Sequence, residues 1–307
     1  MGGTFYANGK LLISGEYMVL HGATALVVPL KLGQHMKVIP AGYDEEGLIH
    51  WQSNVLGEPW FYVSVMTKHW TIEKTSDERI ALNLIEILQE SDKLNHLLFK
   101  PGQNFDIITD TDFNMNWGSG SSSAFIANIA HWAGLNPFEL YFRTSRGSGA
   151  DLAAAISPGP VLYKLLDKKP VFQLIDFKPA FKRNLWLVYL GNKQSSSQSV
   201  HDFLLNGNVK PDDVNRMDHI TIEMTHAKDL QTFMKLMRDH EKTLADILGT
   251  VPIRELLFKD FAGEIKSLGA WGGDFVMAAS LNNENFVKSY FQNKGMFPVL
   301  SFDELVL

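Results

Sequence analysis

Two glycine-serine turns that each run into a helix-forming segment constrain the fold of this chain more than any other feature. The first, at 117–120, precedes a helical pattern over 121–132, and the second, at 147–149, precedes the alanine-rich stretch 150–155. Glycine permits the positive φ angles and the close backbone approach that such turns require. The first turn of a helix has free amides and a positive dipole end, which together favour an anion. The pattern predicts two turn–helix units, of which the first is a candidate ligand site.

The first turn is a candidate phosphate-binding loop. Hydroxyl groups at 121–123 can add hydrogen bonds or a magnesium contact. The loop is not a Walker loop, because no Gly-Lys-Ser/Thr follows, and Ser123 stands where a dinucleotide-binding loop has its third glycine. Taken alone, a flexible turn with a serine cap explains the same residues and is the more common case.

Three other segments carry candidate chemistry. Lys10, close to a glycine turn, could hold a phosphate or a reacting alkoxide, although a lone lysine is more often a solvated surface charge. Asp151 could accept a hydroxyl proton, or could simply be a first-turn acid that the helix dipole favours. The glycine-rich segment 269–274 could be a tight turn or a backbone that lies against a ligand.

The aromatic residues could stack on a base, but they are predicted to pack in the core; they are Trp51, Trp60, Phe61, Tyr62 and Trp70.

The order of the predicted elements indicates an α+β fold. Apolar runs broken by glycine predict strands in the first forty residues, and helical periodicity begins at Asp77. The segment 168–183 contains lysines and prolines and is predicted to connect two domains, 1–180 and 181–307. In the second domain we expect helices at 212–227, 229–248, 256–267 and 283–293, and strands at 184–190, 275–279 and 297–302.

Composition excludes several classes of protein. The 307 residues are 45% hydrophobic, which is enough for a large core, and the net charge of -6 disfavours binding to nucleic acid. Without cysteine there can be no disulfide, thiolate nucleophile or zinc–thiolate site. No stretch approaches the roughly 20 apolar residues of a membrane helix, and the first residues do not resemble a secretory signal. We therefore expect a cytoplasmic protein that neither spans a membrane nor binds nucleic acid.

Taken in order, the four segments resemble the motifs of the GHMP small-molecule kinases, in particular the mevalonate kinase and phosphomevalonate kinase branch. Residues 7–22 (ANGKLLISGEYMVLHG) are similar to the first motif of that family, 117–124 to its phosphate loop, and 148–151 to its Ser-Gly-x-Asp motif. The third motif departs from the family pattern, because Trp271 and Asp274 stand where the family has glycine. The resemblance covers nearly the whole chain.

This resemblance implies the fold and the chemistry. The fold would combine an N-terminal domain like the second domain of ribosomal protein S5 with a ferredoxin-like C-terminal domain. Asp151 would take the acceptor proton and Lys10 would stabilise charge at the attacking oxygen. The ATP phosphates would be bound by Gly118, Ser119, Gly120, Ser121, Ser122 and Ser123, with Mg²⁺ held by Ser122 and Glu139. The acceptor would contact Glu16, His21, Ser148, Gly272 and Gly273.

Several acceptors fit the resemblance. Mevalonate carries one carboxylate, whereas a phosphorylated acceptor adds about two charges and needs more cations than this chain offers near its motifs. Mevalonate is therefore preferred. Phosphomevalonate, a sugar and a catalytically silent nucleotide-binding regulator remain alternatives, and a homodimer remains an option. A diphosphomevalonate decarboxylase is disfavoured because those proteins lack the lysine found here as Lys10.

Overall fold

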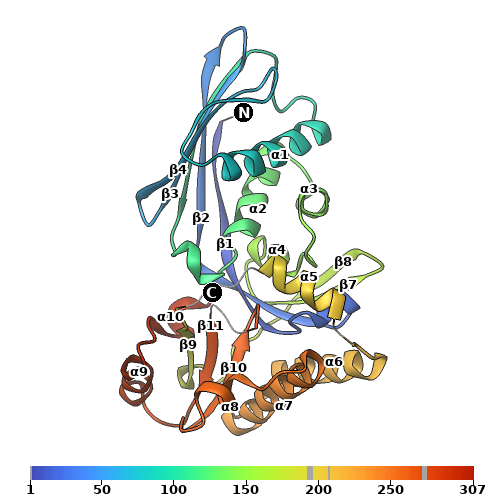
Figure 1. The fold of residues 1–307 in the computed structure, drawn as a ribbon, viewed down its shortest axis with the longest axis vertical. Coiled ribbons are helices and arrows are strands. Elements are labelled where there is room, and N and C mark those ends of the chain that lie inside the picture. The colour runs from blue at the N-terminus through green and yellow to red at the C-terminus, as the bar shows by residue number, and fades with distance from the viewer. Residues whose placement is uncertain (1, 192–195, 207, 272–274) are drawn as a thin grey trace. The chain divides into compact units, whose positions relative to one another are not determined.

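The computed structural model describes residues 2–191, 196–206, 208–271 and 275–307. The chain divides into two compact units (Figure 1). The first unit contains the residues up to Gly9, Leu32–Met115 and Ser119–Ile156, and the second contains Lys10–Lys31, Asn116–Gly118 and Ser157–Leu307. Each unit is described separately. The division predicted at residue 180 stays a prediction.

The first unit is built on a sheet with the strand order β5-β4-β3-β6-β2. Strands β3 and β6 run parallel, and the other neighbours in this order run antiparallel. Strand β1 also pairs with β2. The bounds are β1 Gly3–Ser14, β2 Ala25–Tyr43, β3 Leu48–Val55, β4 Glu58–Met66, β5 Thr71–Thr75 and β6 Gln103–Thr111. Strand β2 runs through Gly33 without a break, although the sequence predicted strands interrupted by glycine in the first forty residues.

Helices of the first unit pack together on one side of these strands (Figure 1). They are α1 Glu78–Leu94, α2 Ser121–Ala133, α3 Pro137–Thr144 and α4 Ala150–Ala155. Helix α2 meets the sheet through aromatic pairs, since the ring centroids of Trp51 and Phe125 lie 5.5 Å apart. Asp77 caps α1 by accepting a hydrogen bond from the Ile80 amide, which confirms the helix start read from the sequence.

The second unit contains the part of the chain that had been predicted as a linker. Strands β7 (Val161–Leu166) and β8 (Lys169–Leu174) form an antiparallel hairpin, and β7 also pairs with the first residues of β2. Residues 169–174 are therefore a strand, and the linker prediction is wrong for them. The lysines and the proline are tolerated because β8 is an edge strand, where side chains and one backbone edge face solvent.

A four-stranded antiparallel sheet with the order β10-β11-β9-β12 forms the rest of the second unit's framework. Its strands are β9 Leu185–Tyr189, β10 Glu264–Leu268, β11 Phe275–Ala279 and β12 Val299–Ser301. The helices are α5 Ser196–Asn206, α6 Pro211–His226, α7 Leu230–Leu248, α8 Ile253–Leu257, α9 Glu284–Asn293 and α10 Phe302–Leu305. Helices α6 and α7 pack side by side, and α7 also packs on β10 (Figure 1).

One predicted helix of this unit is wrong. The segment 256–267 was expected to be helical, but it contains only the end of α8 and then most of β10. Every residue of β10 is buried, including Glu264 and Lys266. The α+β fold class is confirmed. Among the described residues, no helix is long and apolar enough to cross a membrane.

Candidate functional site

The glycine-serine loop opens helix α2 as the sequence predicted. Gly120 is the N-cap, with φ 88° and ψ 27°, a left-handed conformation that favours glycine. As the N-cap residue it offers no side chain to the first-turn amides, so these remain available to a ligand. Ser122 is exposed at the helix start, whereas Ser123 and Ser119 are buried. The Ser119 hydroxyl has no hydrogen-bond partner among the described residues. This geometry is that of an anion site.

A cavity of about 210 Å³ adjoins the start of α2 within the first unit. Ser121 and Ser122 line it at one place, and most of its other lining residues come from strands β3 and β4 and from helices α1 and α2. Aromatic and aliphatic side chains dominate those walls: Trp51, Trp60, Phe61, Phe125, Ile80, Leu84 and Ile87. Polar groups are few, among them Asn54 and Asn83. Such a cavity fits a flat, mostly apolar group with a few polar edges.

This cavity changes the interpretation of the aromatic residues in β3 and β4. Trp51 and Phe61 are buried, as predicted for core packing, yet both also line the cavity. Trp60 is 45% exposed and lines the cavity as well, so its predicted role in core packing is wrong. Sequence alternation cannot separate these roles, because a cavity wall and a core face show the same apolar pattern.

The second glycine-serine turn opens helix α4 within the first unit. Gly149 is its N-cap, with φ 84°, and the Ser148 hydroxyl accepts a hydrogen bond of 3.2 Å from the Ala150 amide. Asp151 therefore lies in the first helical turn, as predicted. Burial and the charge of Asp151 both raise the pKa of the Tyr141 hydroxyl. The Gly149 amide donates to that hydroxyl, which ties helix α3 to the turn that carries Asp151.

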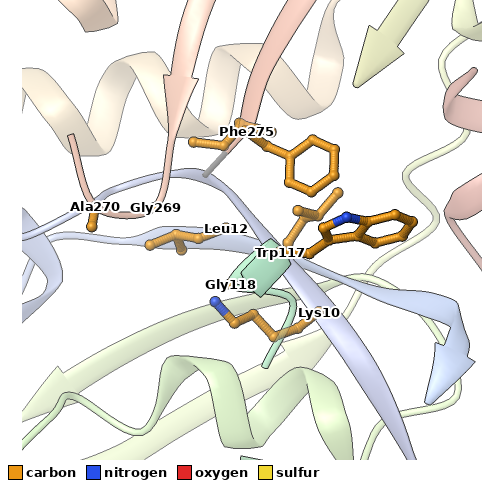
Figure 2. Close-up of a pocket in the computed structure, with 9 residues that line it drawn as sticks. Lys10, Leu12, Trp117, Gly118, Gly269, Ala270 and Phe275 are labelled. Atoms are coloured by element: carbon orange, nitrogen blue, oxygen red, sulfur yellow. The ribbon is translucent and has the colours of Figure 1, made fainter. Parts of the chain in front are cut away.

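Lys10 lies in the second unit and lines a small cavity of about 20 Å³ (Figure 2). The other walls are Leu11, Leu12, Trp117, Gly118, Leu268, Gly269, Ala270 and Phe275. The indole of Trp117 meets the ring of Phe275 edge-on, with centroids 5.7 Å apart. The first motif, the start of the phosphate loop and the described part of the third motif thus meet around one cavity. Asp151 and Lys10 belong to different units, and their predicted proximity stays a prediction.

Two residues predicted to contact the acceptor, Glu16 and His21, differ in their exposure to solvent. Glu16 is 1% exposed, and its carboxylate is paired with Lys266 Nζ at 2.5 Å. A buried and paired carboxylate cannot reach a ligand, so the predicted contact with the acceptor is wrong. His21 is exposed and packs edge-on against Phe203, with ring centroids 5.6 Å apart. Gly272, Gly273, Asp274 and Lys193 lie outside the described residues.

The structure gives no support for a metal ligand at Glu139. Its side chain is 54% exposed on α3 and faces Arg143 at 3.6 Å, in an ordinary i,i+4 surface pair. Across the part of the chain that the structure describes, no group of three His, Asp or Glu residues could hold a metal ion.

Sequence reasoning missed the buried polar residues around Glu16. His240 belongs to the segment 229–248 that was predicted to be helical, and it is fully buried with Nε2 2.8 Å from Glu16 Oε2. Lys266 was expected in a helix and instead lies in a buried strand. The signal that could have found both is the charge of Glu16 inside an apolar segment, because a buried carboxylate requires a partner.

Several solved structures have a similar fold over nearly the whole length of this chain. The Streptococcus pneumoniae phosphomevalonate kinase in complex with phosphomevalonate and AMPPNP superposes with a TM-score of 0.70 at 16% identity, covering 96% of this chain and 97% of that one. The mevalonate kinase of L. major, in complex with R-mevalonate, gives 0.66 at 17% identity, with 97% and 95% covered. The mevalonate diphosphate decarboxylase of Enterococcus faecalis gives 0.60 at 12% identity, with 98% and 97% covered.

These likenesses extend over whole chains but have low identity. No family model and no curated protein matches this sequence. The resemblance drawn from the motifs is thus confirmed at the level of the fold, and this chain has the fold of the mevalonate and phosphomevalonate kinases of the GHMP type.

Proposed function

We propose that this protein is an ATP-dependent kinase that phosphorylates a small alcohol, with mevalonate as the preferred acceptor. The proposal rests on one observation, which is that the anion site at the start of α2 adjoins an aromatic cavity. The amides at the start of α2 and the hydroxyls of Ser121 and Ser122 offer donors to phosphate, and the cavity of about 210 Å³ beside them fits a purine base. A nucleoside triphosphate has this combination of groups.

The proposed reaction transfers the γ-phosphoryl group from ATP to the acceptor oxygen. The bond from the terminal phosphorus to the bridging oxygen breaks, a bond to the acceptor hydroxyl oxygen forms, and ADP leaves. Asp151 accepts the hydroxyl proton, and Lys10 stabilises negative charge at the attacking oxygen. Mg²⁺ bound with the nucleotide would offset phosphate charge, with Ser122 as the described side chain placed to contact it. Positioning and charge stabilisation suffice, so no covalent intermediate is needed.

The structure changes which charged side chains are available to an anionic acceptor. The carboxylate of Glu16 is neutralised by Lys266, so it does not oppose an anionic acceptor. Arg143, a cation close to the predicted site segments, faces Glu139 at 3.6 Å and Glu90 at 3.5 Å, so it is not available to a phosphorylated acceptor. The site thus loses one opposing negative charge, that of Glu16, and one available positive charge, that of Arg143. Because these two losses offset each other, we retain mevalonate, with its single carboxylate, as the proposed acceptor.

Steady-state kinetics with an acceptor panel test this proposal. We expect ADP release that depends on mevalonate, with a higher kcat/KM for mevalonate than for phosphomevalonate, homoserine or sugars. A higher kcat/KM for phosphomevalonate would reassign the acceptor, and a sugar preference would point to a GHMP sugar kinase. ATP binding with no turnover on any acceptor would identify a silent nucleotide-binding regulator and overturn the proposal.

The nucleotide cavity gives an independent prediction. Replacing Trp60 with alanine removes an aromatic wall of the cavity, and we expect ATP affinity to fall roughly tenfold, since stacking on an aromatic ring contributes about 1–3 kcal/mol per base. Tyr62→Ala is the matched control, because Tyr62 lies on the same strand, is 43% exposed and does not line the cavity. Calorimetry should show a loss of affinity in the Trp60 variant alone; equal losses in both would place the base elsewhere.

A further inference from the structure

A group of buried ionisable side chains in the second unit has no place in the proposed chemistry. Glu16, His240, Glu241 and Lys266 are each at most 2% exposed. They come from three separate parts of the chain: the turn after β1, helix α7 and strand β10. Burial of charge is costly unless each group is paired, so the contacts within the group decide what it does.

Lys266 and Glu16 form the central pair. Lys266 Nζ lies 2.5 Å from Glu16 Oε1 and also donates to the Ser267 carbonyl oxygen at 2.7 Å. Burial would raise the pKa of Glu16, but the charge of Lys266 and the hydrogen bonds from its partners offset this and lower the pKa to about 2. Glu16 is therefore ionised at neutral pH, and Lys266 is its charge partner.

Helix α7 completes the surroundings of this pair. Burial and the charge of Lys266 lower the pKa of His240 to about 4, so the imidazole is neutral at neutral pH. Its Nε2 accepts a hydrogen bond of 3.3 Å from the Gly15 amide and lies 2.8 Å from Glu16 Oε2. Glu241, the next residue, accepts hydrogen bonds from the amides of Ser267 at 2.9 Å and Ile253 at 3.3 Å. The two residues that precede Leu268 along the buried strand are thereby tied, Lys266 to the turn at Glu16 and Ser267 to α7.

The pair joins two walls of the small cavity in Figure 2. Glu16 follows the strand that carries Lys10, Leu11 and Leu12, and Lys266 comes two residues before the cavity-lining segment Leu268–Ala270. A second link runs beside the first, because the Trp271 amide donates to the Tyr17 hydroxyl at 3.0 Å. The first-motif turn is thus held to the third-motif segment at two successive residues.

The backbone of the first-motif turn is itself narrowly constrained. Gly15 has φ 90°, and a Cβ there would lie 2.5 Å from the Thr24 carbonyl oxygen. Tyr17 has φ 58°, which is uncommon for a residue with a side chain. Such a turn persists only where its surroundings fix it, and the buried pair supplies that fixation.

From these contacts we infer that Lys266, through its ion pair with Glu16, is a positioning residue that holds the Leu268–Ala270 segment against the Lys10 strand. The pair touches no reacting atom. It sets the shape of the cavity in which Lys10 lies, and its effect on catalysis rests on the proposed function.

A double substitution separates positioning from stability. Glu16→Gln with Lys266→Met removes both charges together, so no unpaired charge is left buried and the protein is expected to fold. The matched control is Glu264→Gln with Arg238→Met, which removes another ion pair between β10 and α7, with Arg238 Nη2 and Glu264 Oε2 2.6 Å apart. Neither control residue lines the cavity.

Two readouts are measured below the melting temperature of every variant. Hydrogen exchange of the Leu268–Ala270 amides should accelerate at least tenfold in the Glu16/Lys266 variant and stay unchanged in the control. In an active enzyme, kcat should fall at least tenfold in that variant alone, while ATP affinity stays within twofold of the wild type.

Each outcome is decisive. Unchanged exchange at Leu268–Ala270 overturns the inference, whatever the activity is. Faster exchange with an unchanged kcat also overturns it, because the segment would then be anchored without consequence for the reaction. A wild-type protein without turnover on any acceptor would refute the proposed function, and the exchange measurement would still test the anchoring.

Discussion

Asp151→Asn is expected to lower kcat by roughly 10² or more, the scale of losing a positioned base. The substitution keeps the size of the side chain and its place in the first turn of α4 but removes the proton acceptor. ATP affinity should be nearly preserved, because the phosphate loop opens a different helix. Steady-state kinetics and nucleotide calorimetry on the same preparation would measure both quantities.

Glu139→Gln is the control for this experiment. It removes a carboxylate from the neighbouring helix α3, where Glu139 is exposed and faces Arg143. We expect kcat to change less than twofold, which would also end the prediction that Glu139 is a magnesium ligand. If the two variants lost activity equally, or if Asp151→Asn were fully active, Asp151 would not be the base.

Gly120→Val is expected to weaken ATP binding by roughly tenfold or more. Gly120 has φ 88°, and forcing a β-branched residue into that region costs about 1–3 kcal/mol. The backbone at the start of α2 can relieve this strain only by moving the amides that would bind phosphate. Calorimetric titration with ATP is the measurement.

The other end of the same helix provides the control for that strain. Gly134 is the C-cap of α2, with φ 65° and no atom within 4 Å of an added Cβ. Gly134→Val should therefore lower the melting temperature in a similar way and leave ATP affinity unchanged. Equal ATP affinity in the Gly120 variant and the wild type would show that the loop does not bind the phosphates.

The sequence predicts well those parts of the fold where a local pattern is sufficient. Helix α2 begins at Ser121 and α1 begins after Asp77, because a glycine in the left-handed region and an aspartate cap are local signals. Helices α6 and α7 and strand β11 were found from periodicity alone. These elements depend little on contacts with distant residues.

Strand β10 was missed because its pattern is misleading without its partners. Three of its five residues, Glu264, Lys266 and Ser267, are polar, whereas a strand that is buried along its whole length is expected to be an apolar run. In the structure both are buried and paired, Glu264 with Arg238 and Lys266 with Glu16. Those partners lie 26 and 250 residues away in sequence, so no window of local sequence could have revealed them.

The candidate site was predicted in part. The motif residues predicted where helices α2 and α4 begin, because glycine turns and small residues are visible in the sequence, and phosphate binding at the first of these turns stays a prediction. The aromatic cavity was not predicted, since strands β3 and β4 and helix α1 converge on it from separate segments. The burial of Glu16 was not predicted either, because its partners follow much later in the chain.

The placement of Lys10–Lys31 in the second unit has a consequence for protein synthesis. This segment is translated early, yet the partner of its buried carboxylate, Lys266, follows 250 residues later. The Leu307 amide donates to the Pro29 carbonyl oxygen at 3.0 Å. The second unit therefore cannot complete its interior before these late residues are synthesised, and a polypeptide ending at residue 180 would leave Glu16 without its counter-charge. We expect this unit to fold only after residues 264–307 have emerged from the ribosome.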